Sequence, residues 1–219
     1  MTAALALALA LAAPAPAPER VVEEIVAVVR NPPSAPPRVV TYTKLVEEAR
    51  VALVSRGAME AASGTLDRAA LRAALEWLLD QMLVSDEATK LRLDEGDRPD
   101  VLAALSRFQG RFATFAAYER FLEHSELSEE ELIATLARMV RVDRYVQSRV
   151  GRTGRVAEDE VDRWLKDRGV ATAPGPVRDA ARAQLAEEKA TAQVRELLSE
   201  LRSRAEVRIV GHLREREGA

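Results

Sequence analysis

Cysteine is absent from the sequence, histidine occurs only twice, and aromatic residues make up 4% of the chain. The absence of cysteine excludes disulfides and thiolate chemistry, and it is compatible with any compartment. His124 and His212 are far apart in the sequence, so neither a zinc site nor a Ser-His-Asp triad has good support. We expect His124 to lie at an exposed helix end, in a structural or solvated role.

Glycine-rich phosphate-binding loops are missing as well. Gly151-Arg-Thr-Gly154 is too short for a Walker-type or GxGxxG loop, and it follows a predicted helix instead of a strand. Carboxylate pairs are frequent, but on exposed helical faces they favour solubility and i,i+4 pairing. The sequence therefore predicts no catalytic, cofactor-binding or metal-binding residue. We expect a protein that is not an enzyme.

The sequence also lacks a large excess of either charge. Its 32 Lys and Arg residues nearly balance its 35 Asp and Glu residues, and the net charge is −3. This balance produces no basic field that would attract nucleic acid. Arg138, Arg141 and Arg144 are the only local candidates for a basic face, and such a charge run is most often a solvated helix surface. The sequence predicts no nucleic-acid partner, and its 47% hydrophobic content is typical of a folded, water-soluble protein.

Long hydrophobic runs are limited to Ala3–Ala13, which is too short for the ~20 apolar residues of a membrane span. Its length suits the core of a signal peptide, and Ala10-Leu-Ala12 supplies a small-x-small cleavage site. No Lys or Arg precedes the run, so a low-complexity tail, or a start codon assigned too far downstream, is the alternative. We expect residues 1–20 to be a signal-like segment with a Pro/Ala spacer, and the mature, exported form to have no membrane span.

Two β-branched runs predict a hairpin near the start of the chain. Val21–Val29 and Arg38–Tyr42 are strand candidates, and the four prolines between them exclude a helix there. A two-stranded ribbon is marginal by itself. Ala205–Val210 alternates polar and apolar residues, with Val207 and Ile209 on one side. We therefore predict that this last strand pairs with the hairpin, so that the two ends of the chain meet in one small sheet.

Helical spacing dominates the rest of the sequence. Thr43 is the predicted N-cap of a short helix, and Asp67 that of a longer one whose apolar stripe should be central to the core. Further helices are expected from Asp100, from the capping box Ser128–Glu131 to Val150, from Glu158 to Arg168, and from Val177 to about Arg204. These elements predict a mainly α fold, with a helical core at about residues 43–168 and a C-terminal helix and strand at about 177–210.

Five aromatic side chains recur at spacings of three or four, which keeps them near one helical face. They are Phe108, Phe112, Phe115, Tyr118 and Phe121. One interpretation is a platform for unfolded chains. Core packing is favoured for an aromatic stripe at helical spacing, so no individual residue can be assigned to binding.

The elements follow in the order "IVAVV", "VVTYTKLVEEA", "LRAALEWLLDQMLVSDEA", "FATFAAYERFLEHSELSEEELIATLARMVRVDRYVQSRV", "VAEDEVDRWLKDRG" and "LLSELRSRAEVRIV". This order resembles the chaperone domain of SurA-type periplasmic proteins over nearly all of Val21–Val210. The resemblance implies that residues 21–219 form a single SurA-like domain. In that family the N-terminal helices form a cradle with a C-terminal helix and strand. Many members also insert a parvulin prolyl-isomerase domain before the final helix. Here that position holds only Gly169–Pro176, far less than the ~50 residues of a domain.

The resemblance implies a periplasmic, ATP-independent holdase without a cofactor. Its partners would be unfolded polypeptides, among them outer-membrane protein precursors. Two alternatives stay open: a helical adaptor that grips one dedicated partner and, less favoured, a peptidyl-prolyl isomerase. A holdase of this kind should carry an exposed apolar surface between its terminal helix and its central bundle. The residues that bind clients and the oligomeric state cannot be read from the sequence.

Overall fold

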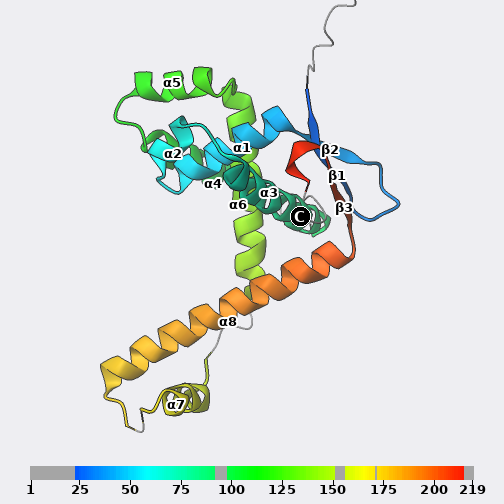
Figure 1. Ribbon diagram of the computed structural model, residues 1–219. Helices are drawn as coiled ribbons and strands as arrows, with labels where there is room; N and C mark the ends of the chain where they lie inside the picture. Colours follow the sequence, from blue (N-terminus) through cyan, green and yellow to red (C-terminus); the bar gives the residue numbers. More distant parts are fainter. Residues whose placement is uncertain (1–22, 92–97, 151–155, 171, 215–219) are drawn as a thin grey trace, which may run out of the picture.

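A computed structural model describes residues 23–91, 98–150, 156–170 and 172–214 (Figure 1). Eight α-helices and a three-stranded antiparallel sheet in this part of the chain confirm the predicted mainly α fold. The signal-like segment predicted for residues 1–20 and the residues Gly151–Gly154 lie outside the described ranges. Within the described ranges, no helix combines the length and the apolar character needed to cross a membrane.

The small sheet joins the two ends of the described chain. Its strands are β1 (Ile25–Arg30), β2 (Arg38–Thr41) and β3 (Glu206–Ile209), with β1 in the middle. Ala27 lies opposite Ile209, and Val29 lies opposite Val207, so the predicted meeting of the ends is confirmed (Figure 1). The first strand begins at Ile25, later than predicted.

A polar contact fastens the segment that follows β3. Glu24 accepts a hydrogen bond from the backbone N–H of His212 at 3.0 Å, and the Nδ1 atom of the imidazole lies 2.9 Å from both carboxylate oxygens. These hydrogen bonds lower the pKa of Glu24 below its ordinary value. Gly211 has φ +65°, and a Cβ there would collide with Glu24. Glycine suits this position because it adopts a positive φ without the strain of other residues, and because a Cβ would displace the carboxylate of Glu24.

Helix α1 (Tyr42–Ser55) continues directly from β2, and α3 (Arg68–Lys90) crosses the centre of the molecule. The predicted N-cap at Thr43 is wrong, since Thr41 accepts the N–H of Lys44 and the helix begins at Tyr42. Asp67 caps α3 as predicted. The first core lies between the sheet, α1, α3, α6 and α8 and includes Val26, Val29, Leu45, Leu75, Leu79, Leu83, Tyr145, Leu201 and Leu213.

A second core holds the aromatic residues. It is formed by α1 together with α2 (Met59–Ser63), α4 (Arg98–Gln109), α5 (Phe115–His124) and α6 (Glu129–Val150). The expectation of one aromatic helix is wrong, because the chain turns after Gln109 and restarts with Thr114 as N-cap of α5. Core packing is confirmed for Phe108, Tyr118 and Phe121, which are buried, whereas Phe115 is 65% exposed. The predicted capping box of α6 is also confirmed, with Ser128 and Glu131 bonded in both directions.

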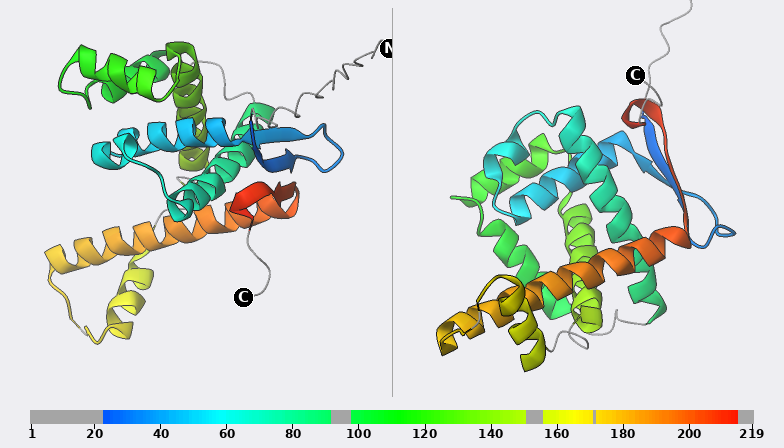
Figure 2. Two further views of the ribbon diagram at one scale, coloured as in Figure 1. Left: turned by 45° about the horizontal axis from the view of Figure 1, so that its top comes forward. Right: turned by 60° about the horizontal axis from the view of Figure 1, so that its bottom comes forward.

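Helices α7 (Glu158–Asp167) and α8 (Gly175–Ser203) project from this body, and we call them the α7–α8 arm (Figure 2). At 29 residues, α8 is about 44 Å long. Pro176 lies in its first turn, where its missing N–H has no cost. The outer half of α8 packs against α7, and its inner half packs against α3, with Arg202 ion-paired to Glu76 and Asp80. The arm is thus held to the body through its C-terminal half.

Candidate functional site

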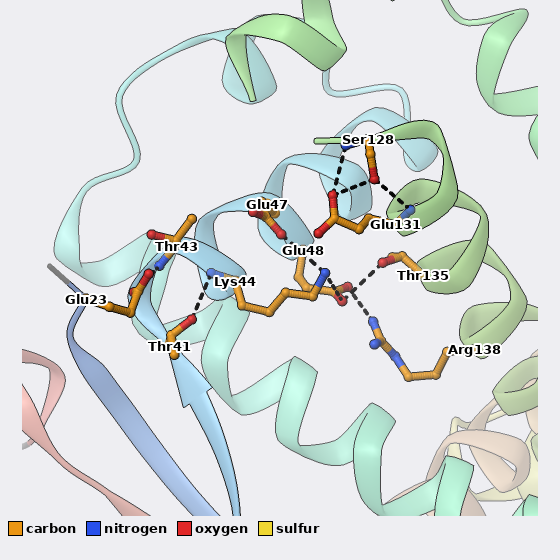
Figure 3. A network of polar contacts seen from close by, with 10 residues as sticks. All are labelled: Glu23, Thr41, Thr43, Lys44, Glu47, Glu48, Ser128, Glu131, Thr135 and Arg138. Atoms are coloured by element: carbon orange, nitrogen blue, oxygen red, sulfur yellow. Dashed lines mark hydrogen bonds and ion pairs between the residues drawn. The ribbon is translucent and has the colours of Figure 1, made fainter. Parts of the chain in front are cut away.

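A buried carboxylate joins α1 to α6 (Figure 3). The side chain of Glu48 is 1% exposed, accepts a hydrogen bond from Thr135 at 3.2 Å, and is ion-paired with Arg138. Lys44 lies 3.7 Å from Glu48 and donates to Glu47 at 3.2 Å. The expectation that the carboxylate pairs lie on exposed faces is therefore wrong for Glu47 and Glu48. Burial raises the pKa of Glu47, and Lys44 opposes that shift.

The predicted solvated face at Arg138, Arg141 and Arg144 is also wrong. All three side chains are half-buried: Arg138 pairs with Glu48, Arg141 donates to Ser85, and Arg144 pairs with Asp100. Their partners lie on α1, α3 and α4, the helices that surround α6. Because each of these arginines contacts a side chain of a neighbouring helix, they do not form an open basic surface.

Next to this network, a cavity of about 250 Å³ lies between β2, α1, α3 and α6. Its charged lining residues are Arg38, Lys44, Glu48, Asp86 and Arg138. Each of them has a partner within the set, as in the pair of Arg38 and Asp86 at 2.6 Å. Because these charges already satisfy one another, we interpret this cavity as part of the joint between the sheet and the helices.

A second cavity is open and almost wholly apolar. We call it the α1–α3 slot, a space of about 220 Å³ lined by Ala49, Ala52, Leu53, Arg56, Leu66, Ala70, Ala73, Ala74 and Trp77. Alanine side chains from both helices face the slot and leave room that larger residues would fill. Arg56 lies over the ring of Trp77, with 5.7 Å between the guanidinium carbon and the ring centroid, a cation–π contact. The slot can therefore receive an apolar side chain of another molecule.

A third cavity adjoins the slot, since Arg56 lines both. We call it the α4–α6 cavity, a space of about 280 Å³ lined by Ser55, Arg56, Ala104, Arg107, Phe108, Arg111, Leu136, Met139, Val140 and Asp143. Its only carboxylate is Asp143, whose pKa is raised by partial loss of water and lowered less strongly by Arg107. Three arginines thus face one carboxylate across an apolar floor. The slot and this cavity together form what we call the Arg56 surface.

The three arginines of the α4–α6 cavity have few partners. Arg56 contacts Trp77, Arg107 donates to the carbonyl of Ala103 on its own helix at 3.3 Å, and Arg111 donates to the carbonyl of Ser55 at 3.4 Å. Among the residues that the structure describes, none of these three is ion-paired with a carboxylate. No local sequence pattern indicates the Arg56 surface, because its walls come from four separate helices, α1, α3, α4 and α6.

Neither histidine lines a cavity of the Arg56 surface. Over the described ranges, no cluster of three or more His, Asp or Glu side chains could hold a metal ion. His124 lies exposed at the end of α5, as predicted, and its carbonyl accepts a hydrogen bond from Arg50. His212 belongs to the contact with Glu24. The Arg56 surface is therefore the arrangement that suits binding.

Comparisons with protein-family models, with curated proteins and with solved structures found no match. The resemblance to SurA-type chaperones therefore stays a prediction from the order of elements.

Proposed function

We propose that the protein binds apolar segments of unfolded polypeptides at the Arg56 surface and holds them without nucleotide, as a periplasmic holdase-type chaperone. The open α1–α3 slot carries this proposal. Eight of its nine lining residues are apolar, and Arg56 is the ninth. A concave site with apolar walls is the kind of site that takes up an apolar group of a ligand. At about 220 Å³, the slot is smaller than the ~300–1,000 Å³ typical of small-molecule sites, so it suits a side chain better than a whole cofactor.

The size of the slot also suggests how binding would be reversed. Burying one large apolar side chain contributes about 1.5–3 kcal/mol, which is too little to hold a client permanently. A client would be retained by several such contacts in succession, and each of them could open separately. Release would then follow when the client folds and buries its own apolar side chains. This mechanism requires no bond chemistry from the protein.

The periplasmic location and the outer-membrane clients are parts of the same proposal. They are supported by the signal-like apolar run and by the order of elements, which is similar to that of SurA-type proteins. The chain between α7 and α8 contains seven residues, 168–174. This is far below the ~50 residues of a domain, so no isomerase domain fits there. The adaptor alternative differs from a holdase in binding one dedicated partner instead of many unfolded clients.

Filling the slot is expected to abolish most of the holding activity. In Ala73→Leu, the larger leucine side chain fills the slot from an exposed position on α3. Alanine and leucine both have high helix propensity, so α3 should be retained. Ala69→Leu makes the same change at an exposed position on the same helix outside the slot. Light scattering of an unfolded outer-membrane β-barrel, diluted from urea, should be suppressed by the mature protein and by Ala69→Leu at near-stoichiometric ratio. It should be suppressed only weakly by Ala73→Leu.

Two results would count against this proposal. Scattering that persists at a several-fold excess of the unaltered protein would remove the holdase function. Equal suppression by Ala73→Leu and Ala69→Leu would remove the slot as its site. Circular dichroism of both variants checks that each keeps its helical content.

A further inference from the structure

The α4–α6 cavity combines an apolar floor with an excess of positive charge, because Arg56, Arg107 and Arg111 face the single carboxylate of Asp143. Phe108 and Leu136 are buried beneath it, and Met139 and Val140 are half-buried beside them. Guanidinium groups stay charged at any physiological pH. Many other arginines of this chain are ion-paired with carboxylates, as Arg38 is with Asp86. A ligand that matches this cavity needs an apolar group and an anion side by side.

We infer that the α4–α6 cavity binds the carboxyl-terminal residue of a polypeptide, with its apolar side chain on the floor and its α-carboxylate at Arg107 and Arg111. This inference rests on the proposed function and names the part of the client that binds first. A carboxylate and a guanidinium can form two parallel hydrogen bonds, a charge-assisted pair that is stronger than a neutral one. The volume of about 280 Å³ is just below the range of small-molecule sites, which fits one terminal residue.

A chain terminus fits this cavity better than an internal acidic residue. In an extended segment, neighbouring side chains point to opposite faces, and those two positions apart are about 6.6 Å apart along the strand. An internal acidic side chain and an adjacent apolar one would therefore not enter the same cavity together. At the C-terminus both groups are attached to one Cα atom, so a single residue supplies both.

Three peptides that differ only at their ends would test this inference by fluorescence anisotropy. One ends in leucine with a free carboxylate, the second is its C-terminal amide, and the third is the amide with aspartate before the leucine. Because a hydrogen bond to a charged group is strong, we expect the free acid to bind the protein about tenfold or more tighter than either amide. High salt should reduce this difference, since the attraction is partly screened.

Two arginine variants test whether the preference for the free acid arises in the α4–α6 cavity. Arg107→Ala removes a side chain whose Nε donates to the carbonyl of Ala103, and Arg120→Ala removes one with the equivalent contact to Ala116 on α5. Both side chains are exposed, so both variants should fold. The preference for the free acid should fall to about threefold or less in Arg107→Ala, with one strong hydrogen bond lost, and should stay unchanged in Arg120→Ala.

Equal binding of the free acid and the amide, or an unchanged preference in Arg107→Ala, would overturn the inference. Tight binding of the aspartate amide would overturn it too, because it would assign the site to internal acidic residues. Aggregation assays on the same preparations separate the two proposals. Suppression without any preference for a carboxylate leaves the holdase function standing and removes the terminal site. Absence of both suppression and peptide binding removes both.

Discussion

Replacing Glu48 by alanine is expected to lower the free energy of unfolding by about 3–5 kcal/mol. The carboxylate is 1% exposed, and its ion pair with Arg138 and hydrogen bond from Thr135 connect α1 to α6. Without it, the Arg138 guanidinium, whose side chain is 20% exposed, would remain in a partly dry position without its counter-charge. Leaving a buried charge uncompensated costs more than the pair itself contributes. Urea denaturation followed by circular dichroism at neutral pH measures the loss.

A double replacement separates the charge effect from a simple loss of contact. Glu48→Leu combined with Arg138→Met keeps side-chain volume and removes both charges, and we expect it to recover most of the lost stability. Glu119→Ala on α5, where the side chain is exposed, should change the free energy of unfolding by less than about 0.5 kcal/mol. A loss below about 1 kcal/mol in Glu48→Ala would contradict the role of this joint.

Leu213→Ala is expected to cost about 2–5 kcal/mol. Leu213 follows β3 in the short 3₁₀ turn at Gly211–Leu213, is 0% exposed, and belongs to the first core with residues of α3. Its carbonyl also accepts a hydrogen bond from Arg72 at 2.7 Å. The end of the described chain is therefore a structural part of the core, and truncating this side chain leaves a cavity in it.

The matched control for this change is Leu102→Ala on α4. Leu102 is 57% exposed, so the same truncation there should alter the urea midpoint little. If the two variants unfold at the same urea concentration, the C-terminal segment does not stabilise the core as we describe.

Local patterns in the sequence predicted the elements well. The alternation in Ala205–Val210 and the β-branched hairpin predicted all three strands, and Asp67 and Ser128 predicted two helix starts. A predicted helix start was wrong where two nearby residues were equally suitable as the N-cap. Thr41 and Thr43 both suit an N-cap, and the choice between them depends on where β2 ends. The turn between α4 and α5 was missed because the aromatic spacing continues through it.

Tertiary contacts could not be predicted in the same way. The burial of Glu48 and its ion pair with Arg138 depend on how α1 packs across α6. The spacing of apolar residues along each helix does not predict how two helices cross. The expected apolar surface next to the terminal helix is a separate prediction from the Arg56 surface. None of the residues that line the two cavities of the Arg56 surface belongs to α8. The alanines of α1 and α3 were visible in the sequence, but only the packing of these helices shows that they leave an open slot.

Hydrogen–deuterium exchange with and without an unfolded outer-membrane β-barrel tests the binding of clients at the Arg56 surface most directly. Bound client should slow exchange in the second half of α1 and in the first half of α3, at residues 49–56 and 66–77, which line the slot. Exchange in the α7–α8 arm should stay unchanged outside the contact with α3. Protection confined to the α7–α8 arm or to the edges of the sheet, with none at the slot, would contradict the proposed site.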